Sequence, residues 1–171
     1  MAATTAIYQY TGSGPTGTSI TNQRYCTDDS IDTGSPGTYP LVKPAAGTSY
    51  SYTSTVALYV SSGPAGSITN IKWYGDGSSY GTGITVKGIQ TNTYTQAVGT
   101  SGTGGTLDAT VYTGGTDMTT YTSASPLSVT SNATTGTGRY SYYVRSQLAM
   151  STSVAAGAFS ARTNTFRWDE T

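Results

Sequence analysis

The sequence predicts an all-β protein, namely an antiparallel β-sandwich of the jelly-roll or immunoglobulin-like kind with an extended N-terminal arm. The aromatic residues are 15 Tyr against 2 Trp and 2 Phe, and tyrosine, like threonine, fits the half-buried surface of a pleated sheet. The 22 Gly and 6 Pro supply turns. Short runs with period-two alternation recur about every 8 to 15 residues, which is the spacing of sandwiches and barrels. Leu is scarce and the one Glu is Glu170, so the residue mixture that favours helices is missing.

Residues 1–48 carry little pattern, and we interpret them as an N-terminal arm or as long loops laid on a surface. Short strands are expected within this part at residues 7–10 and 20–25, whereas residues 11–19 (TGSGPTGTS) are interpreted as a flexible loop. The patterned β-sandwich domain is expected to span residues 49–171.

Residues 49–62 contain the first clear strand of this domain. Val56, Leu58 and Val60 fall on one face, and serine and threonine occupy much of the other. Strict alternation of this kind is typical of a strand that buries one face. We therefore expect these three side chains in the core.

Residues 67–74 predict the next strand, with Ile71 and Trp73 on its core face. Gly and Asp tolerate positive φ, so residues 75–78 (GDGS) predict a hairpin turn. A short strand is expected at residues 84–87.

Later in the chain, Gly/Thr loops alternate with short β runs, of which residues 107–112 and 128–130 are the expected strands. The strongest strand signal covers residues 139–150, and a last strand is expected at residues 164–169. In the 139–150 strand, one face carries Tyr140, Tyr142, Val144, Leu148 and Met150, and the other carries Arg139, Tyr143, Arg145 and Gln147.

The composition excludes several classes of function. The chain has no histidine, so it has no Ser–His or Cys–His relay and no imidazole metal ligand. It carries 8 basic and 8 acidic residues, and only 9% of its residues are charged, against about 25% in typical domains. Nucleic acids and anionic membranes need a clustered positive field, so neither is expected as a partner. Weak charge repulsion favours association, and we expect the chain to work inside an assembly.

Cys26 is the single cysteine, which rules out an intrachain disulfide. We interpret it as a small buried residue and not as a nucleophile. The first ten residues have neither the basic nor the apolar run of a signal peptide, and no segment reaches the roughly 20 apolar residues of a membrane span. These features indicate a protein that is made and folded in a cytosol.

Acidic residues offer two candidate sites. Asp28, Asp29 and Asp32 could supply oxygens to Ca²⁺, but their spacing matches no EF-hand loop, and an aspartate-stabilised turn is the alternative. Asp169 and Glu170 are neighbours at the end of a strand, where adjacent side chains point to opposite faces, so they do not suit a paired-carboxylate hydrolase. We therefore expect no catalytic residue, no metal and no cofactor.

The tyrosines have two interpretations. They can form cross-strand pairs within a sheet, which we expect of Tyr50, Tyr52, Tyr140 and Tyr142. They can also supply contacts to sugars or to other proteins, because tyrosine is enriched at interfaces. The candidate interface residues are Tyr59, Tyr74, Tyr80, Tyr143, Arg145 and Trp168.

Two stretches carry a family resemblance. The run 56–60, the turn GPAG and the run 68–74 (ITNIKWY) resemble a segment of the β-sandwich proteins of tailed-bacteriophage virions. So do the late Tyr/Val/Arg strand and the closing FRWDE of residues 166–170. The resemblance covers roughly residues 48–171. It implies a protein that decorates or cements the head, or a tail or fibre module, and it implies no catalytic residues.

The leading hypothesis is a non-enzymatic virion structural protein, a capsid decoration or cement protein that binds the capsid lattice and stabilises it. A neutral polar surface that faces the outside of a cell, without an export signal, fits a virion component assembled in the host cytoplasm. The expected partners are capsid or other virion proteins and further copies of the chain, with a trimer as one arrangement. The alternatives are a carbohydrate- or receptor-binding module of a tail or fibre, and a self-assembling extracellular filament subunit.

Overall fold

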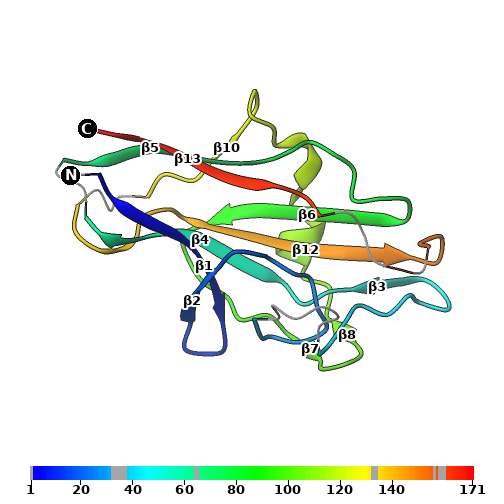
Figure 1. The fold of residues 1–171 in the computed structure, drawn as a ribbon. Coiled ribbons are helices and arrows are strands. Elements are labelled where there is room, and N and C mark those ends of the chain that lie inside the picture. The colour runs from blue at the N-terminus through cyan, green and yellow to red at the C-terminus, as the bar shows by residue number, and fades with distance from the viewer. Residues whose placement is uncertain (1, 32–37, 64–65, 132–134, 156, 158–160) are drawn as a thin grey trace.

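The computed structural model describes residues 2–31, 38–63, 66–131, 135–155, 157 and 161–171. These residues form antiparallel β-sheets packed as a sandwich, which confirms the predicted all-β fold (Figure 1). The strands are β1 (Thr4–Thr11), β2 (Thr16–Ile20), β3 (Thr48–Tyr50), β4 (Ser54–Ser62), β5 (Ile68–Gly75), β6 (Ile84–Thr91), β7 (Gly99–Thr100), β8 (Gly104–Gly105), β9 (Thr116–Asp117), β10 (Leu127–Ser128), β11 (Gly138–Arg139), β12 (Tyr143–Ser151) and β13 (Asn164–Glu170). Two helical turns are η1 (Ala109–Thr113) and η2 (Met118–Thr120).

The larger sheet, sheet A, has the strand order β2-β1-β4-β12-β6-β9, with β11 added beside β4 and β3 added beside β12. The smaller sheet, sheet B, has the order β10-β5-β13, and β7 pairs with β8 in a separate hairpin. Strand β1 begins and β13 ends at the same end of the molecule (Figure 1). There the backbone N–H of Ala3 donates to Glu170 Oε1 at 2.9 Å.

The core lies between the two sheets and contains the side chains that alternation predicted. Val56, Leu58 and Val60 of β4 are each at most 2% exposed, and Ile71 and Trp73 of β5 face them from sheet B. Burying one large apolar side chain contributes about 1.5–3 kcal/mol, so this cluster is the main source of stability. Phe166 of β13 packs against the same cluster.

The N-terminal segment contains the strand expected at residues 7–10, as part of a longer strand that joins sheet A. Residues 4–11 form β1, which lies inside sheet A and pairs with β4 from Thr5 opposite Val60 to Tyr10 opposite Thr55. The expected loop at residues 11–19 supplies β2, the hairpin partner of β1. The period-two alternation is weak in β1 because Gln9, a polar residue, occupies a buried position of the strand.

The expected hairpin at residues 75–78 is also corrected. Strand β5 belongs to sheet B and β6 to sheet A, so the chain between them crosses from one sheet to the other. Asp76 organises this crossing, because its carboxylate accepts hydrogen bonds from the N–H groups of Ser78 at 2.9 Å and Thr163 at 3.1 Å.

The strand predicted at residues 107–112 is not formed, and the helical turn η1 (Ala109–Thr113) takes most of its place. The side chain of Asp108 accepts hydrogen bonds from the N–H groups of Thr110 and Val111 and so caps the start of η1. An aspartate that bonds the amides two and three positions ahead favours a helical turn over an extended strand. Val111 points into the protein and is fully buried.

Residues 93–113, named here the covering segment, lie against the outer face of sheet A at β12. Strand β12 therefore has both faces covered, and Tyr143, Arg145 and Gln147 are buried although they alternate with the core residues. The sequence pattern placed these three on the polar face correctly, but that face is only partly in contact with solvent.

Candidate functional site

A cluster of aromatic rings lies on the outer face of sheet A and is named here the tyrosine face. Alternation along β1 turns Ile7 toward the core and the neighbouring tyrosines away from it. Strands β4, β11 and β12 and the loop after β6 supply the rest. The tyrosine face consists of Tyr8, Tyr10, Tyr59, Tyr94, Tyr143 and Arg139.

Tyr8 and Tyr59 form one pair of rings in the tyrosine face. Their rings are stacked, with centroids 4.2 Å apart and planes inclined by 21°. The register explains the contact, because Ala6 lies opposite Tyr59 and Ala57 lies opposite Tyr8. The two small residues leave room for the diagonal rings to meet. Tyr8 and Tyr59 are both partly exposed.

Tyr143 joins the rings of the other strands. Its ring meets Tyr10 edge to face at 5.0 Å and Tyr94 at 6.0 Å. These are the geometries that aromatic pairs prefer, and each contributes roughly 0.5–1.5 kcal/mol beyond the area it buries. Gly17 of β2 lies opposite Tyr10, and a Cβ at this position would come within 2.7 Å of the Tyr10 ring. A glycine is therefore needed there for the ring to keep its place.

Arg139 supplies the positive charge of the tyrosine face. Its guanidinium carbon lies 4.1 Å from the centre of the Tyr143 ring, which is a cation–π contact. The guanidinium also donates to the carbonyl of Ser141 at 2.6 Å and to that of Asn92 at 3.5 Å. These bonds hold it over the Tyr143 ring, and the side chain stays partly exposed.

Two phenol groups of the tyrosine face, those of Tyr10 and Tyr94, are neutral over the physiological pH range. Burial raises the pKa of Tyr10 to about 12, and the neighbouring Tyr143 adds to the effect. Burial also raises the pKa of Tyr94 to about 12, with a further contribution from Asp29. Neutral phenols act as hydrogen-bond donors and apolar surface and not as bases. The arrangement suits binding.

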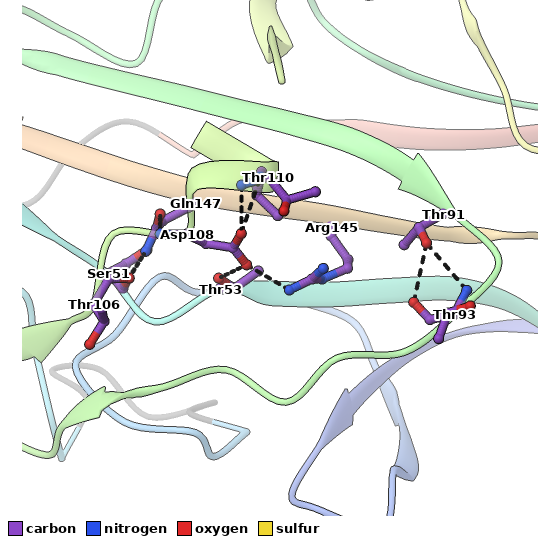
Figure 2. A network of polar contacts seen from close by, with 10 residues as sticks. Ser51, Thr53, Thr91, Thr93, Thr106, Asp108, Thr110, Arg145 and Gln147 are labelled. Atoms are coloured by element: carbon purple, nitrogen blue, oxygen red, sulfur yellow. Dashed lines mark hydrogen bonds and ion pairs between the residues drawn. The ribbon is translucent and has the colours of Figure 1, made fainter. Parts of the chain in front are cut away.

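A second polar cluster holds the covering segment on sheet A (Figure 2). Arg145 of β12 forms an ion pair with Asp108, with 2.7 Å between Nη2 and Oδ2. Gln147 accepts from the N–H of Asp108 and donates to the carbonyls of Ser51 and Thr106. Both N–H donors and the oxygen of the Gln147 amide are thus used for structure, and the Arg145 and Gln147 side chains are buried.

A hollow of about 160 Å³ is lined by residues of both sheets. Ile7, Ile20, Trp73 and Phe166 are among its apolar lining residues, and Asn164 is among the polar ones. Ligand pockets commonly measure about 300–1,000 Å³. The hollow is therefore too small for an extended substrate, and the tyrosine face is the better candidate site.

The structure places the predicted interface residues in different environments. Tyr59 and Tyr143 both belong to the tyrosine face, although only Tyr59 is partly exposed. Arg145 is 4% exposed and engaged with Asp108, so its guanidinium is not available to a partner.

The other three predicted interface residues do not join the tyrosine face. Tyr74 lies on β5 in sheet B, and Trp168 of β13 packs partly buried against the core. Tyr80 also packs against the core, and burial raises its pKa to about 12.

Sequence reasoning missed Tyr8, Tyr10, Tyr94 and Arg139. A signal for the first two was present, because Tyr8 and Tyr10 are spaced two apart in a short expected strand. Interpreting residues 1–48 as an arm removed them from consideration. No pattern in the sequence locates Tyr94, which reaches the cluster from a loop.

The acidic turn is built by hydrogen bonds. Asp29 accepts from the N–H of Gly12 and from Gln96 Nε2, and Asp28 accepts from the Ser101 hydroxyl. Asp32 lies outside the described residues. No group of three or more His, Cys, Asp or Glu side chains that could hold a metal ion occurs in the described part of the chain. Within the same part, no helix has the length and apolar character needed to cross a membrane.

Comparisons with known proteins give no relative for this chain. No protein family matches it, and neither the curated proteins nor the solved structures contain a significant match.

Proposed function

We propose that the protein is a non-enzymatic structural subunit of a virion, which decorates a capsid and stabilises it by docking through the tyrosine face. The observation that carries the proposal is the gathering of five aromatic rings, in two contacting groups, on the outer face of sheet A, with Arg139 lying against one of them. Tyrosine and arginine are enriched at the energetic centres of protein interfaces. The resemblance of residues 48–171 to tailed-phage virion proteins supports the choice of particle.

The low charge of the chain fits docking by aromatic burial. With 8 basic and 8 acidic residues, long-range steering contributes little to association. Tyrosine rings bring a large contact area at a low entropic cost, because each has two side-chain torsions. The partly exposed Tyr8 and Tyr59 would then form the centre of the contact.

Many copies would act together on a lattice. A weak contact repeated by linked subunits binds far more strongly than one contact alone, because the second binding event becomes intramolecular. A homo-oligomer, with a trimer as one arrangement, would supply this effect. The proposed location is the virion, with capsid or other virion proteins as partners.

Particles prepared without the protein provide the test. Adding back the wild-type chain should raise their resistance to heat, and the Tyr59→Ala variant should restore less. Tyr74→Ala is the matched control, because Tyr74 is also a partly exposed strand tyrosine but belongs to sheet B. Equal heat resistance with and without the wild-type chain would refute the cement function. Equal rescue by Tyr59→Ala would refute the docking surface.

A carbohydrate- or receptor-binding module is the second candidate, and the stacked Tyr8–Tyr59 pair favours it. Partly exposed aromatic rings can stack on sugar rings, and a neighbouring guanidinium such as Arg139 can donate to sugar hydroxyls. Binding of the wild-type chain to a glycan array, lost in Tyr59→Ala and kept in Tyr74→Ala, would support this candidate over the structural one.

A further inference from the structure

Strand β13 forms one edge of sheet B and has β5 as its neighbour. Its ladder runs from Asn164 opposite Gly75 to Glu170 opposite Ile68, with a register shift between Arg167 and Asp169. On the other side of β13, no strand from the described residues pairs with it. An open edge of this length presents a row of backbone donors and acceptors to any further strand.

The free backbone groups of β13 belong to its even-numbered residues. Residues that bond a given neighbour alternate along an antiparallel strand. Thr171, just beyond β13, exchanges two backbone hydrogen bonds of 3.0 Å with Ser67, just before β5. The register shifts between Arg167 and Asp169, but the extra residue lies on β5, so the alternation along β13 is unbroken. Odd-numbered residues therefore face β5, and the N–H and C=O groups of Phe166, Trp168 and Glu170 point outward. Among the described residues, β13 pairs with no strand other than β5, and no backbone hydrogen bond of a turn or loop uses these outward groups.

Two charges of opposite sign lie two residues apart on the outer face of β13. Arg167 is exposed and lies directly opposite Lys72 of β5, which is an unfavourable pairing of like charges. Asp169 is exposed and accepts a hydrogen bond from Asn70 Nδ2 at 2.9 Å. Among the described residues, Arg167 takes part in no ion pair.

These charges select one register for pairing β13 with a second copy of itself. A twofold axis brings residues of the same face opposite each other. When the axis passes Trp168, Arg167 of each copy lies opposite Asp169 of the other, so two complementary pairs form. When the axis passes Arg167 or Asp169 instead, two like charges face each other.

We propose that two copies of the chain associate through β13, antiparallel and centred on Trp168, to make one continuous sheet from the two sheets B. The outward groups of Phe166, Trp168 and Glu170 then form about six backbone hydrogen bonds across the axis. The charges of Arg167 and Asp169 lie at the non-hydrogen-bonded positions, where opposing side chains are closest. The tyrosine face lies on sheet A and β13 lies in sheet B. An experiment can therefore refute this contact without refuting the proposed docking surface, and the reverse.

Sedimentation of the full chain tests the association. The wild type should form dimers in a concentration-dependent way below roughly 1 mM, the weak end of specific affinity. Arg167→Asp sets two carboxylates against each other at both pairs and should weaken dimerisation at least about tenfold. The same change replaces a like-charge pairing with Lys72 by a favourable one, and an unchanged circular-dichroism spectrum would show that loss of the dimer does not come from loss of the fold.

The charge swap Arg167→Asp with Asp169→Arg is the decisive variant. It restores both complementary pairs in the register centred on Trp168 and should recover the dimer. Lys43→Asp is the control, since it makes the same change of charge at an exposed position away from β13 and should leave the dimer unchanged.

Three results would overturn the proposal. A wild-type chain that stays monomeric over this concentration range would mean that the charges of β13 only protect its edge. A dimer that tolerates Arg167→Asp would use another surface. A dimer that is lost in the single variant and not recovered by the swap would exclude the proposed register.

Discussion

Arg145 and Asp108 form a buried ion pair between sheet A and the covering segment, with 2.7 Å between Nη2 and Oδ2. The Arg145 side chain is 5% exposed and that of Asp108 is 19% exposed. The other carboxylate oxygen of Asp108 accepts from the N–H groups of Thr110 and Val111. One side chain therefore neutralises a charge in sheet A and caps the helical turn that lies over it (Figure 2).

Asp108→Asn should separate these two roles. Asparagine caps a helical turn about as well as aspartate, but it leaves the Arg145 guanidinium buried without a counter-charge. Removing one partner of a buried ion pair typically costs about 3–5 kcal/mol, and the partial exposure of Asp108 places the expected loss of unfolding free energy near the lower value. Urea denaturation of both proteins would measure it.

Asp108→Ala should cost about 1 kcal/mol more than Asp108→Asn, because the cap is lost as well. An Asp108→Asn protein as stable as the wild type would show that Arg145 finds another partner or water. Equal costs for the two variants would show that the cap contributes nothing measurable.

Gly88→Ala should destabilise the protein by roughly 1–3 kcal/mol, the usual cost of overpacking a core. A Cβ at Gly88 would collide with the Met118 sulfur and would lie 2.8 Å from the carbonyl oxygen of Arg145. That oxygen belongs to the backbone of β12 and cannot move without disturbing sheet A. Thermal unfolding should therefore show a clearly lower Tm.

Gly14→Ala is the matched control for Gly88→Ala. A Cβ at Gly14 meets nothing within 4 Å, so its Tm should stay close to that of the wild type. Similar Tm values for the two variants would contradict the close packing of Met118 on β6.

The stack of Tyr8 on Tyr59 should be measurable as a coupling free energy. A double-mutant cycle with Tyr8→Ala and Tyr59→Ala should give about 0.5–1.5 kcal/mol, the range for paired aromatic rings. Tyr8→Ala combined with Tyr74→Ala is the control, because the two side chains belong to different sheets and should contribute additively. A coupling that is indistinguishable between the two cycles would contradict the stacked geometry.

Alternation predicted the core of this protein well, because period two reports directly which face of a strand is buried. Val56, Leu58 and Val60 follow it, and so do Ile71 and Trp73. It could not predict the covering segment, since burial of Arg145 and Gln147 depends on a contact with residues about 40 positions earlier.

The candidate site was less predictable than the core, because it too depends on contacts between residues that are distant in the sequence. Tyr59 and Tyr143 were expected at an interface, but their partners Tyr8 and Tyr10 come from β1, which pairs with β4 across about 50 residues of chain. The side chain of Tyr94 enters from a loop without any periodic pattern. A cluster built across distant strands is visible only once the register is known.

The free energy of unfolding should fall with pH in the alkaline range, because burial holds several tyrosines in the neutral form. The pKa of Tyr10 and that of Tyr80 are raised from 10.0 to about 12. Burial raises the pKa of Tyr25 as well, against the opposing effect of its hydrogen bond to Ser146. Between pH 10 and 12 the unfolded chain therefore loses phenol protons that the native protein retains.

Because the unfolded state binds fewer protons in this window, the free energy of unfolding decreases as pH rises. The stabilisation from these neutral phenols is complete below pH 10 and is lost as pH passes the native values near 12. Absorbance of tyrosinate in a pH titration should show a fraction of the tyrosines ionising well above 10 in the native protein. Tyr25→Phe should flatten the alkaline decline in stability, because phenylalanine has no proton to lose. A native titration that matches the urea-unfolded chain throughout would contradict the burial of these phenols.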